Sequence, residues 1–240
     1  MKVIVGTQEE VVAQASQRYV NLLAAKPDAV LGLATGSTPL SLYAELARLC
    51  AAGELSFAEC STFNLDEYIG LDGTNEQSYR YFMDHNLFSK VDIKMERTHV
   101  PSGFVKDDAE AAQYDALIDE AGGIDLQLLG IGNNGHIGFN EPLTPFTSVT
   151  HIVKLTDSTR EANKRFFSSL DEVPTHAVTM GIHTVMKARS INLLAFGEAK
   201  AEIIKKTVEG RPDIAVPASL LQLHEDVTLY LDRAAAAKLS

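Results

Sequence analysis

IDLQLLGIGNNGHIGFNEP (residues 124–142) has the pattern of a buried strand followed by a glycine-rich turn. After the apolar run IDLQLL, the chain carries glycines, asparagines, one histidine and one glutamate before it reaches a proline. Glycines let the backbone take a positive φ and approach a ligand closely. A histidine and a glutamate five residues apart can hold and move a proton. The segment therefore indicates an active site at the end of a strand.

The same letters also match the dinucleotide-binding pattern G-x-G-x-x-G, at Gly130, Gly132 and Gly135. Asp157 even lies about twenty positions on, where that pattern places an acidic partner for a ribose. A dinucleotide turn leads straight into a long helix, however, and here a further glycine and two prolines follow at once. We therefore disfavour dinucleotide binding. An ordinary glycine-rich loop is the other alternative, and it does not explain the titratable pair.

Short apolar runs alternate with longer amphipathic runs along the whole chain, which is typical of an α/β fold. The runs predict a doubly wound, mostly parallel sheet with helices on both faces, a Rossmann-like three-layer sandwich, in one domain over residues 1–240. The expected strands are 2–5, 29–33, 61–65, 124–129, 191–196 and 227–231. The expected helices begin at a capping box at Thr7 and continue with 39–52, 75–87, 107–121, 158–168 and 198–208.

Composition excludes several classes of protein. The 240 residues carry a formal charge of -11 without a basic run, which disfavours nucleic acid and anionic membranes as partners. Cys50 and Cys60 have no C-x-x-C or histidine cluster beside them, so neither a disulfide framework nor a metal site is expected. No signal-peptide pattern and no long apolar segment occur. We expect a soluble, cytoplasmic protein with a small-molecule partner.

ATGSTP (residues 34–39) lies between an expected strand and an expected helix. Thr35, Gly36, Ser37 and Thr38 would leave backbone and hydroxyl donors at the helix N-terminus, which suits a phosphate group. The alternative is a simple helix cap in which a hydroxyl satisfies the backbone. The segment lacks the Gly-Lys-Ser/Thr ending of a Walker loop.

Asp66 and Glu67 directly follow the expected strand 61–65. Adjacent carboxylates at the end of a strand need either solvation or a role, and one of them would serve as a general base. The alternative is a solvated turn, which Asp72-Gly73 supports.

His136 and Glu141 suggest a proton-transfer pair, and Asn134 lies close enough in sequence to orient the imidazole. A metal centre is disfavoured, because no second histidine stands at helical spacing. The chain has no G-x-S-x-G motif, which disfavours a serine hydrolase. Arg165 and Lys200 are candidate cations for a phosphate, and each is a solvated surface charge by default.

Taken together, these stretches resemble the glucosamine-6-phosphate deaminase family. The resemblance covers essentially the whole chain. It rests on LATGSTPLSLY, FNLDEY with GTNEQSY, LGIGNNGHIGFNEP, STREANKRFF, FGEAKA, and VEG before QLH. It implies a cofactor-free enzyme of amino-sugar catabolism, formally a hydrolase, that converts glucosamine 6-phosphate and water into fructose 6-phosphate and ammonia.

The resemblance also implies roles for individual residues. Asp66 would move the proton between C2 and C1, and His136 would open the pyranose ring with Asn134 and Glu141 as its partners. The segment Thr35 to Thr38, with Arg165 and Lys200, would hold the 6-phosphate.

The sequence departs from the family in two places, one beside the imidazole and one in the regulatory segment. Asn134 stands where some members carry Asp, so an orienting group is neutral here. His151 and Val153 stand where the allosteric hexameric members use basic residues, and the C-terminus is shorter. We therefore expect no activation by N-acetylglucosamine 6-phosphate and no hexamer. A monomer is the expected state, with another homo-oligomer as the alternative. The competing functions are a 6-phosphogluconolactonase, a non-catalytic sugar-phosphate sensor and an isomerase for a neutral sugar phosphate.

Overall fold

A seven-stranded parallel sheet forms the centre of the protein, in a computed structural model that describes residues 1–164 and 167–240. The strand order is β1-β10-β9-β6-β2-β3-β5. From β2 the chain winds outward to β3 and β5, and then returns to β6 on the other side of β2. This reversal makes the crevice between β2 and β6 the topological switch point, where ligands bind in open α/β sheets. The strands are β1 Lys2–Gly6, β2 Val30–Leu33, β3 Ser61–Asn64, β5 Thr98–His99, β6 Leu126–Leu129, β9 Ile191–Ala195 and β10 Val227–Asp232.

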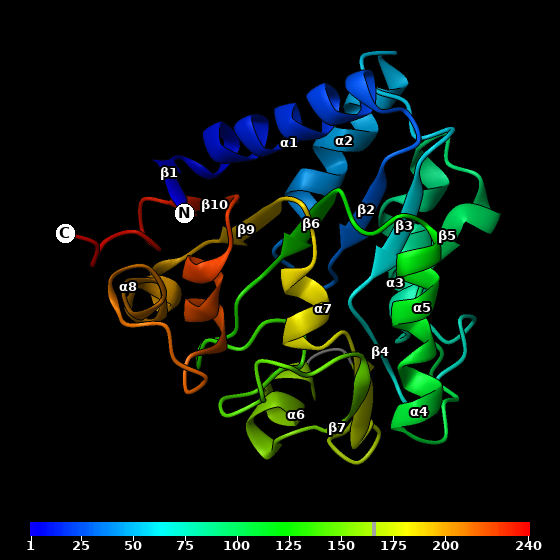
Figure 1. Cartoon of the computed structure of the whole chain (residues 1–240), viewed down its shortest axis with the longest axis vertical. Helices are drawn as coiled ribbons and strands as arrows, with labels where there is room; N and C mark the ends of the chain where they lie inside the picture. The colour runs from blue at the N-terminus through cyan, green and yellow to red at the C-terminus, as the bar shows by residue number, and fades with distance from the viewer. Residues whose placement is uncertain (165–166) are drawn as a thin grey trace.

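A second, three-stranded antiparallel sheet has the order β4-β8-β7. Its strands are β4 Asp66–Tyr68, β7 His151–Lys154 and β8 His176–Thr179. Figure 1 shows β4 and β7 beyond the arrowheads of β2, β3 and β6, beside α6 (Asp157–Asn163). The sequence did not predict this sheet. It closes over the edge of the main sheet at which the ligand is expected.

Helices cover both faces of the main sheet, as predicted. Contacts join α1 to α2 and α2 to α3 on one face. On the opposite face, Lys187 at the end of α7 forms an ion pair of 2.5 Å with Asp119 of α5. Right-handed crossovers in a doubly wound sheet require this division. The remaining helices are α1 Gln8–Ala25, α2 Leu40–Ala51, α3 Tyr79–Asn86, α4 Asp108–Ala111, α5 Gln113–Glu120, α7 Ile182–Met186 and α8 Ala201–Glu209, with the 3-10 turns η1 Phe88–Lys90, η2 Met95–Arg97, η4 Glu198–Lys200 and η5 Pro217–Leu223.

The predicted strands are all confirmed to within two residues, whereas several helix bounds are wrong. The capping box is confirmed, because the Thr7 hydroxyl accepts from the Glu10 N–H at 3.2 Å and the Glu10 carboxylate accepts from the Thr7 N–H at 2.7 Å. Helix 75–87 begins only at Tyr79, where the Ser78 side chain caps it. Helix 107–121 is divided at Ala112, and α6 is shorter than the predicted 158–168. Among the described residues, no helix is both long and apolar enough to cross a bilayer.

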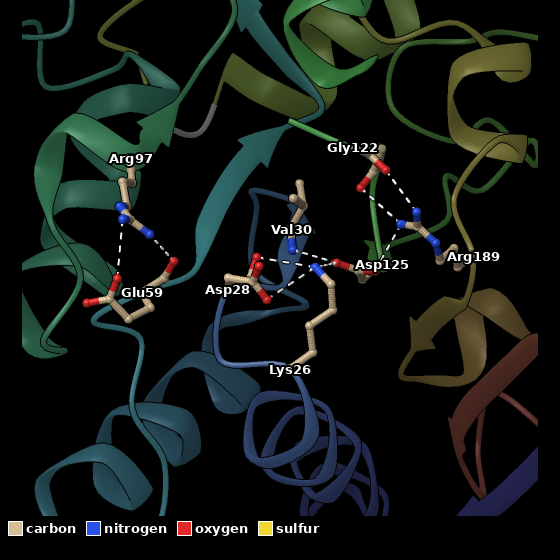
Figure 2. Close-up of polar contacts among 9 residues, drawn as sticks. Lys26, Asp28, Val30, Glu59, Arg97, Gly122, Asp125 and Arg189 are labelled. Atoms are coloured by element: carbon tan, nitrogen blue, oxygen red, sulfur yellow. Dashed lines mark hydrogen bonds and ion pairs between the residues drawn. The ribbon is translucent and has the colours of Figure 1, made fainter. Parts of the chain in front are cut away.

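At the amino ends of the strands, one buried carboxylate joins three of them. Asp125 precedes β6 and accepts from the Val30 backbone N–H at 2.8 Å, from Lys26 at 2.9 Å and from Arg189 at 2.9 Å (Figure 2). Its side chain is 6% exposed. A buried acceptor with charged donors stabilises the fold more than a surface ion pair does. This end of the sheet therefore has a structural role.

We expect Asp125→Ala to lower the free energy of unfolding by about 2–3 kcal/mol, because it leaves a buried N–H and two cations without their acceptor. Urea denaturation of the purified variant measures this difference. Asp28→Ala is the matched control, since Asp28 pairs with the same Lys26 at 3.6 Å but its side chain is 75% exposed. The control should change stability by less than about 0.5 kcal/mol. Equal losses in the two variants would contradict the role assigned to Asp125.

Candidate active site

Four adjacent strands deliver the candidate residues to one edge of the sheet. In the order β9-β6-β2-β3, the carboxyl ends lead to Lys200, to the glycine-rich segment 129–142, to the turn 35–38 and to Asp66. The carboxyl ends of parallel strands lie at the same edge of a sheet, so these segments meet there.

The chain leaves the main sheet after β3 and joins the second sheet at Asp66. The Leu65 N–H still donates to Leu33 of β2 at 3.0 Å, while its carbonyl accepts from the Met180 N–H at 2.7 Å. The next residue, Asp66, therefore lies in β4 opposite Thr179 of β8. Its side chain is buried, so the interpretation of residues 66 and 67 as a solvated turn is wrong. Burial, and secondarily the charge of Glu67, raises the pKa of Asp66 to about 8.

Glu67 is the structural member of the acidic pair. Successive side chains of a strand point to opposite faces, so Glu67 is directed away from Asp66. Its carboxylate accepts from the backbone N–H groups of Tyr68, Tyr79 and Arg80 at 2.8, 2.9 and 3.0 Å. Burial raises the pKa of Glu67, and these N–H donors oppose that shift. Because the Glu67 oxygens are engaged in holding the start of α3, Asp66 is the carboxylate available for proton transfer.

The glycines of the segment 129–142 make room for functional side chains. A Cβ atom on Gly132 would lie 2.3 Å from the His136 ring, so the imidazole packs directly over that glycine. Gly138 has a φ of +58°, and a Cβ there would lie 2.8 Å from Thr179 Oγ1 and 3.6 Å from Asp66 Oδ2. Turns and bends, without a helix, follow residue 130 up to β7. The segment is therefore a frame for side chains, and it lacks the helix that a dinucleotide-binding turn requires.

His136 and Glu141 form the expected pair. Nδ1 of His136 lies 3.6 Å from Oε1 of Glu141, and the two side chains are 25% and 20% exposed. Oε2 of Glu141 accepts from Asn134 Nδ2 at 2.5 Å, and Oε1 accepts from the Thr159 hydroxyl at 2.7 Å. Burial alone would raise the pKa of Glu141, but His136, Thr159 and Asn134 outweigh it and lower the pKa to about 2. Glu141 is thus a carboxylate throughout the neutral pH range.

Asn134 orients a different group from the one expected. The sequence predicted a contact with the imidazole, whereas the described contacts of its side chain are with the Glu141 carboxylate and, at 3.2 Å, with the backbone N–H of His136. A two-residue separation in a tight turn places the side chain beside its own backbone, which is the usual geometry of an Asx turn. Asn134 therefore reaches the imidazole only through Glu141.

The turn 35–38 leads into the N-terminus of α2. Pro39 is the N-cap residue, and no side chain caps the helix, so the interpretation of this turn as a simple capped helix start is wrong. Gly36 has a φ of +91°, which other residues rarely adopt. The Tyr43 hydroxyl fixes the preceding residue, donating to the Ala34 carbonyl at 2.6 Å. The N-terminal N–H groups of α2 are thus presented to the switch-point crevice, as anion sites require.

Lys200 reaches the site from β9. Its ammonium group donates to the Ile131 carbonyl and to Asn133 Oδ1, both at 2.7 Å, and so holds the start of the glycine-rich segment. Arg165, the other predicted cation, lies outside the described residues.

Two threonines at the site were not predicted. Thr159 of α6 bonds Glu141, and Thr179 of β8 accepts from the Phe139 N–H at 3.1 Å beside Asp66. Thr159 belongs to STREANKRFF, one of the stretches that carry the resemblance, but that motif gave it no role. Thr179 lies in none of those stretches. Only the second sheet and α6 bring them to the site.

A separate cavity of about 660 Å³ lies on the Glu67 side of β4. Two of its polar groups are paired: Arg80 bonds Thr98 at 3.0 Å, and the Tyr114 hydroxyl lies within hydrogen-bond distance of the carbonyls of Asn64 and His99. The candidate catalytic groups Asp66, His136 and Glu141 do not line it. This cavity is therefore not the candidate active site.

Comparisons with known proteins agree with this geometry. The family model described as glucosamine-6-phosphate isomerases/6-phosphogluconolactonase matches residues 6–230. The glucosamine-6-phosphate deaminase of Thermoanaerobacter sp. (strain X514) is 51% identical over 239 residues, which is 99% of this chain and 94% of that protein. The glucosamine-6-phosphate deaminase of Bacillus pumilus (strain SAFR-032) is 51% identical over 233 residues, or 96% of each chain.

Solved structures separate two branches of the fold. A monomeric glucosamine-6-phosphate deaminase superposes with a TM-score of 0.96 at 47% identity, over 99% of this chain and 100% of that one. The 6-phosphogluconolactonase of Thermotoga maritima has a TM-score of 0.75 at 18% identity, over 96% and 98% of the two chains, and so shares only the fold. The chain belongs to the glucosamine-6-phosphate isomerase/6-phosphogluconolactonase family.

Proposed function

We propose that this chain converts glucosamine 6-phosphate and water into fructose 6-phosphate and ammonia. The observation that carries the proposal is the buried carboxyl of Asp66, with its raised pKa, at the same sheet edge as the His136–Glu141 pair. Relatives named glucosamine-6-phosphate deaminase support it, because they are 51% identical to this chain along nearly its whole length. A lactonase hydrolyses an ester and has no step that needs a base for a carbon–hydrogen bond.

Ring opening is the step we assign to His136. It moves a proton from the anomeric hydroxyl to the ring oxygen, which an imidazole does as base and then acid. The Glu141 carboxylate faces Nδ1, so the ring proton stays on that nitrogen and Nε2 is left to face the sugar. Asn134 fixes the other oxygen of Glu141.

Carbon-proton transfer is the step we assign to Asp66. The open-chain aldehyde acidifies the C2 hydrogen. Asp66 removes it as a proton while the aldehyde oxygen takes a proton from the C2 ammonium group, which leaves an enol that carries the amine. Asp66 then returns the proton to C1, which yields an imine at C2. Water adds to the imine and ammonia leaves. Because C1 gains the hydrogen that C2 loses, the isomerisation needs no external oxidant or reductant.

The phosphate would bind at the turn 35–38, where the free N–H groups of α2 and the hydroxyl groups supply donors. Lys200 adds positive charge from the end of β9, which is separated from β2 by β6. The chemistry is an isomerisation coupled to deamination, and hydrolysis describes only its net stoichiometry. We infer a cytoplasmic location, because a charged sugar phosphate does not cross membranes freely.

We expect a monomer that N-acetylglucosamine 6-phosphate does not activate. A solved relative with a TM-score of 0.96 is a monomeric enzyme. Val153 of β7 carries no charge, and the His151 ring is bonded to the Val149 carbonyl at 2.7 Å, so neither is a free cation for an anionic effector. Substrate saturation curves with and without N-acetylglucosamine 6-phosphate should coincide, and sedimentation should give the chain mass of 26.1 kDa. A lower half-saturation concentration with the effector would contradict the first expectation, and a larger mass the second.

The direct test is to incubate the purified protein with glucosamine 6-phosphate and to quantify both products. Ammonia and fructose 6-phosphate should appear in equal amounts. The absence of both products would overturn the proposal.

A further inference from the structure

The two carboxylate oxygens of Glu141 contact different residues. Oε2 is fixed by Asn134 at 2.5 Å, while Oε1 faces both the Thr159 hydroxyl at 2.7 Å and His136 Nδ1 at 3.6 Å. The nitrogen Nδ1 is buried and has no hydrogen-bond partner among the described residues. Oε1 is therefore the atom that must be placed correctly for the imidazole to be oriented.

Thr159 is itself held by its neighbours on α6. The Thr156 hydroxyl donates to Thr159 Oγ1 at 2.9 Å, and it accepts from the Thr159 N–H at 3.2 Å as the N-cap of the helix. Thr159 is only 8% exposed. Since Oγ1 of Thr159 receives a proton from Thr156, its own hydroxyl proton is directed to Glu141. The chain of donors runs from Thr156 through Thr159 to the carboxylate.

A carboxylate needs a hydrogen bond to each of its oxygens to be held in one orientation. The terminal torsion of a glutamate is broad and nearly two-fold, so a single bond to Oε2 leaves the plane of the carboxylate free to turn. A second donor on Oε1 removes this freedom. Thr159 is the described residue that supplies that second donor besides His136 itself.

We propose that Thr159 is a positioning residue for ring opening: its hydroxyl fixes Oε1 of Glu141 where that atom orients the His136 imidazole. The inference rests on the proposed deaminase function, in which His136 opens the sugar ring. It also connects α6 to the catalytic pair, so that a displacement of this helix would disturb the orientation of Glu141.

Ring opening can be measured without turnover. In an Asp66→Asn background the C2 proton is not removed, so bound glucosamine 6-phosphate only opens and closes its ring. Two-dimensional exchange NMR measures the rate at which its α and β anomers interconvert. This rate reports only the ring opening that is assigned to His136 and Glu141. Adding Thr159→Val should slow this exchange about tenfold, the effect of losing one hydrogen bond to a charged group. Thr159→Ser should retain at least about half of the exchange rate, because it keeps the hydroxyl.

Thr144→Val in the same background is the matched control. The Thr144 hydroxyl donates to the backbone carbonyl of Glu141 at 2.7 Å and does not contact the carboxylate. Its exchange rate should stay within about twofold of the background. The same exchange rate with and without Thr159→Val would overturn the proposal, as would an equal loss in Thr144→Val. A failure of the proposed function is recognised separately, because the wild-type protein would then release no ammonia from glucosamine 6-phosphate.

Discussion

Asp66→Asn is expected to stop ammonia release while substrate still binds. The substitution keeps the shape of the side chain but removes the base that takes the C2 proton, and a positioned general base contributes roughly two to four orders of magnitude. Because the contribution arises in the transition state, kcat should fall and the dissociation constant for glucosamine 6-phosphate should change by less than about threefold. Initial rates of ammonia release give kcat, and isothermal titration calorimetry gives the dissociation constant.

The same substitution should make the protein relatively more stable at high pH. The pKa of Asp66 is raised to about 8 in the folded protein, so the folded state keeps a proton that the unfolded chain releases near its ordinary pKa. The contribution of Asp66 to stability is therefore fully present below about pH 4 and is lost as the pH rises through about 8, by up to about 1.4 kcal/mol per unit. Asp66→Asn removes this loss. The melting temperature of Asp66→Asn, measured relative to that of the wild type, should rise between pH 5 and pH 9.

Glu67→Gln is the matched control for Asp66→Asn. Glu67 accepts from three backbone N–H groups, so the neutral amide should lower stability, whereas catalysis should remain within about tenfold of the wild type. Loss of turnover in Glu67→Gln with full turnover in Asp66→Asn would exchange the roles assigned to the two carboxylates.

His136→Gln is expected to have the second largest effect. Glutamine can still form hydrogen bonds but does not move a proton near neutral pH, so kcat should fall by roughly two to three orders of magnitude. Anomer exchange of glucosamine 6-phosphate, measured as above in an Asp66→Asn background, should fall with it. His151→Gln, at a histidine bonded to the Val149 carbonyl outside the site, should retain wild-type turnover. An active His136→Gln would remove His136 from the ring-opening step.

The central strands could be predicted from sequence because they are buried on both faces. Runs such as VLGL and INLLA are mostly apolar, and their residues are all buried. The second sheet escaped prediction for the opposite reason. Its strand β7 is half-exposed, and β4 has three residues that include both carboxylates. Such strands exist only because partners distant in sequence pair with them.

The site was predictable where one motif holds the interacting groups. His136 and Glu141 lie in a single turn, so their contact follows from local geometry. The burial of Asp66 depends on β8, which is more than a hundred residues away and pairs with it at Thr179. The link from Thr159 to Glu141 likewise depends on where α6 docks. Tertiary placement, which local patterns do not encode, decides both.

Comparing two substrates tests the central claim, that Asp66 makes this fold act on a carbon acid. Wild-type protein and Asp66→Asn are each given glucosamine 6-phosphate and 6-phosphogluconolactone, and kcat/KM is measured for both. We predict ammonia release by the wild type, its loss in Asp66→Asn, and no lactone hydrolysis above the uncatalysed rate in either. Rapid lactone hydrolysis without ammonia, unchanged by Asp66→Asn, would contradict the account.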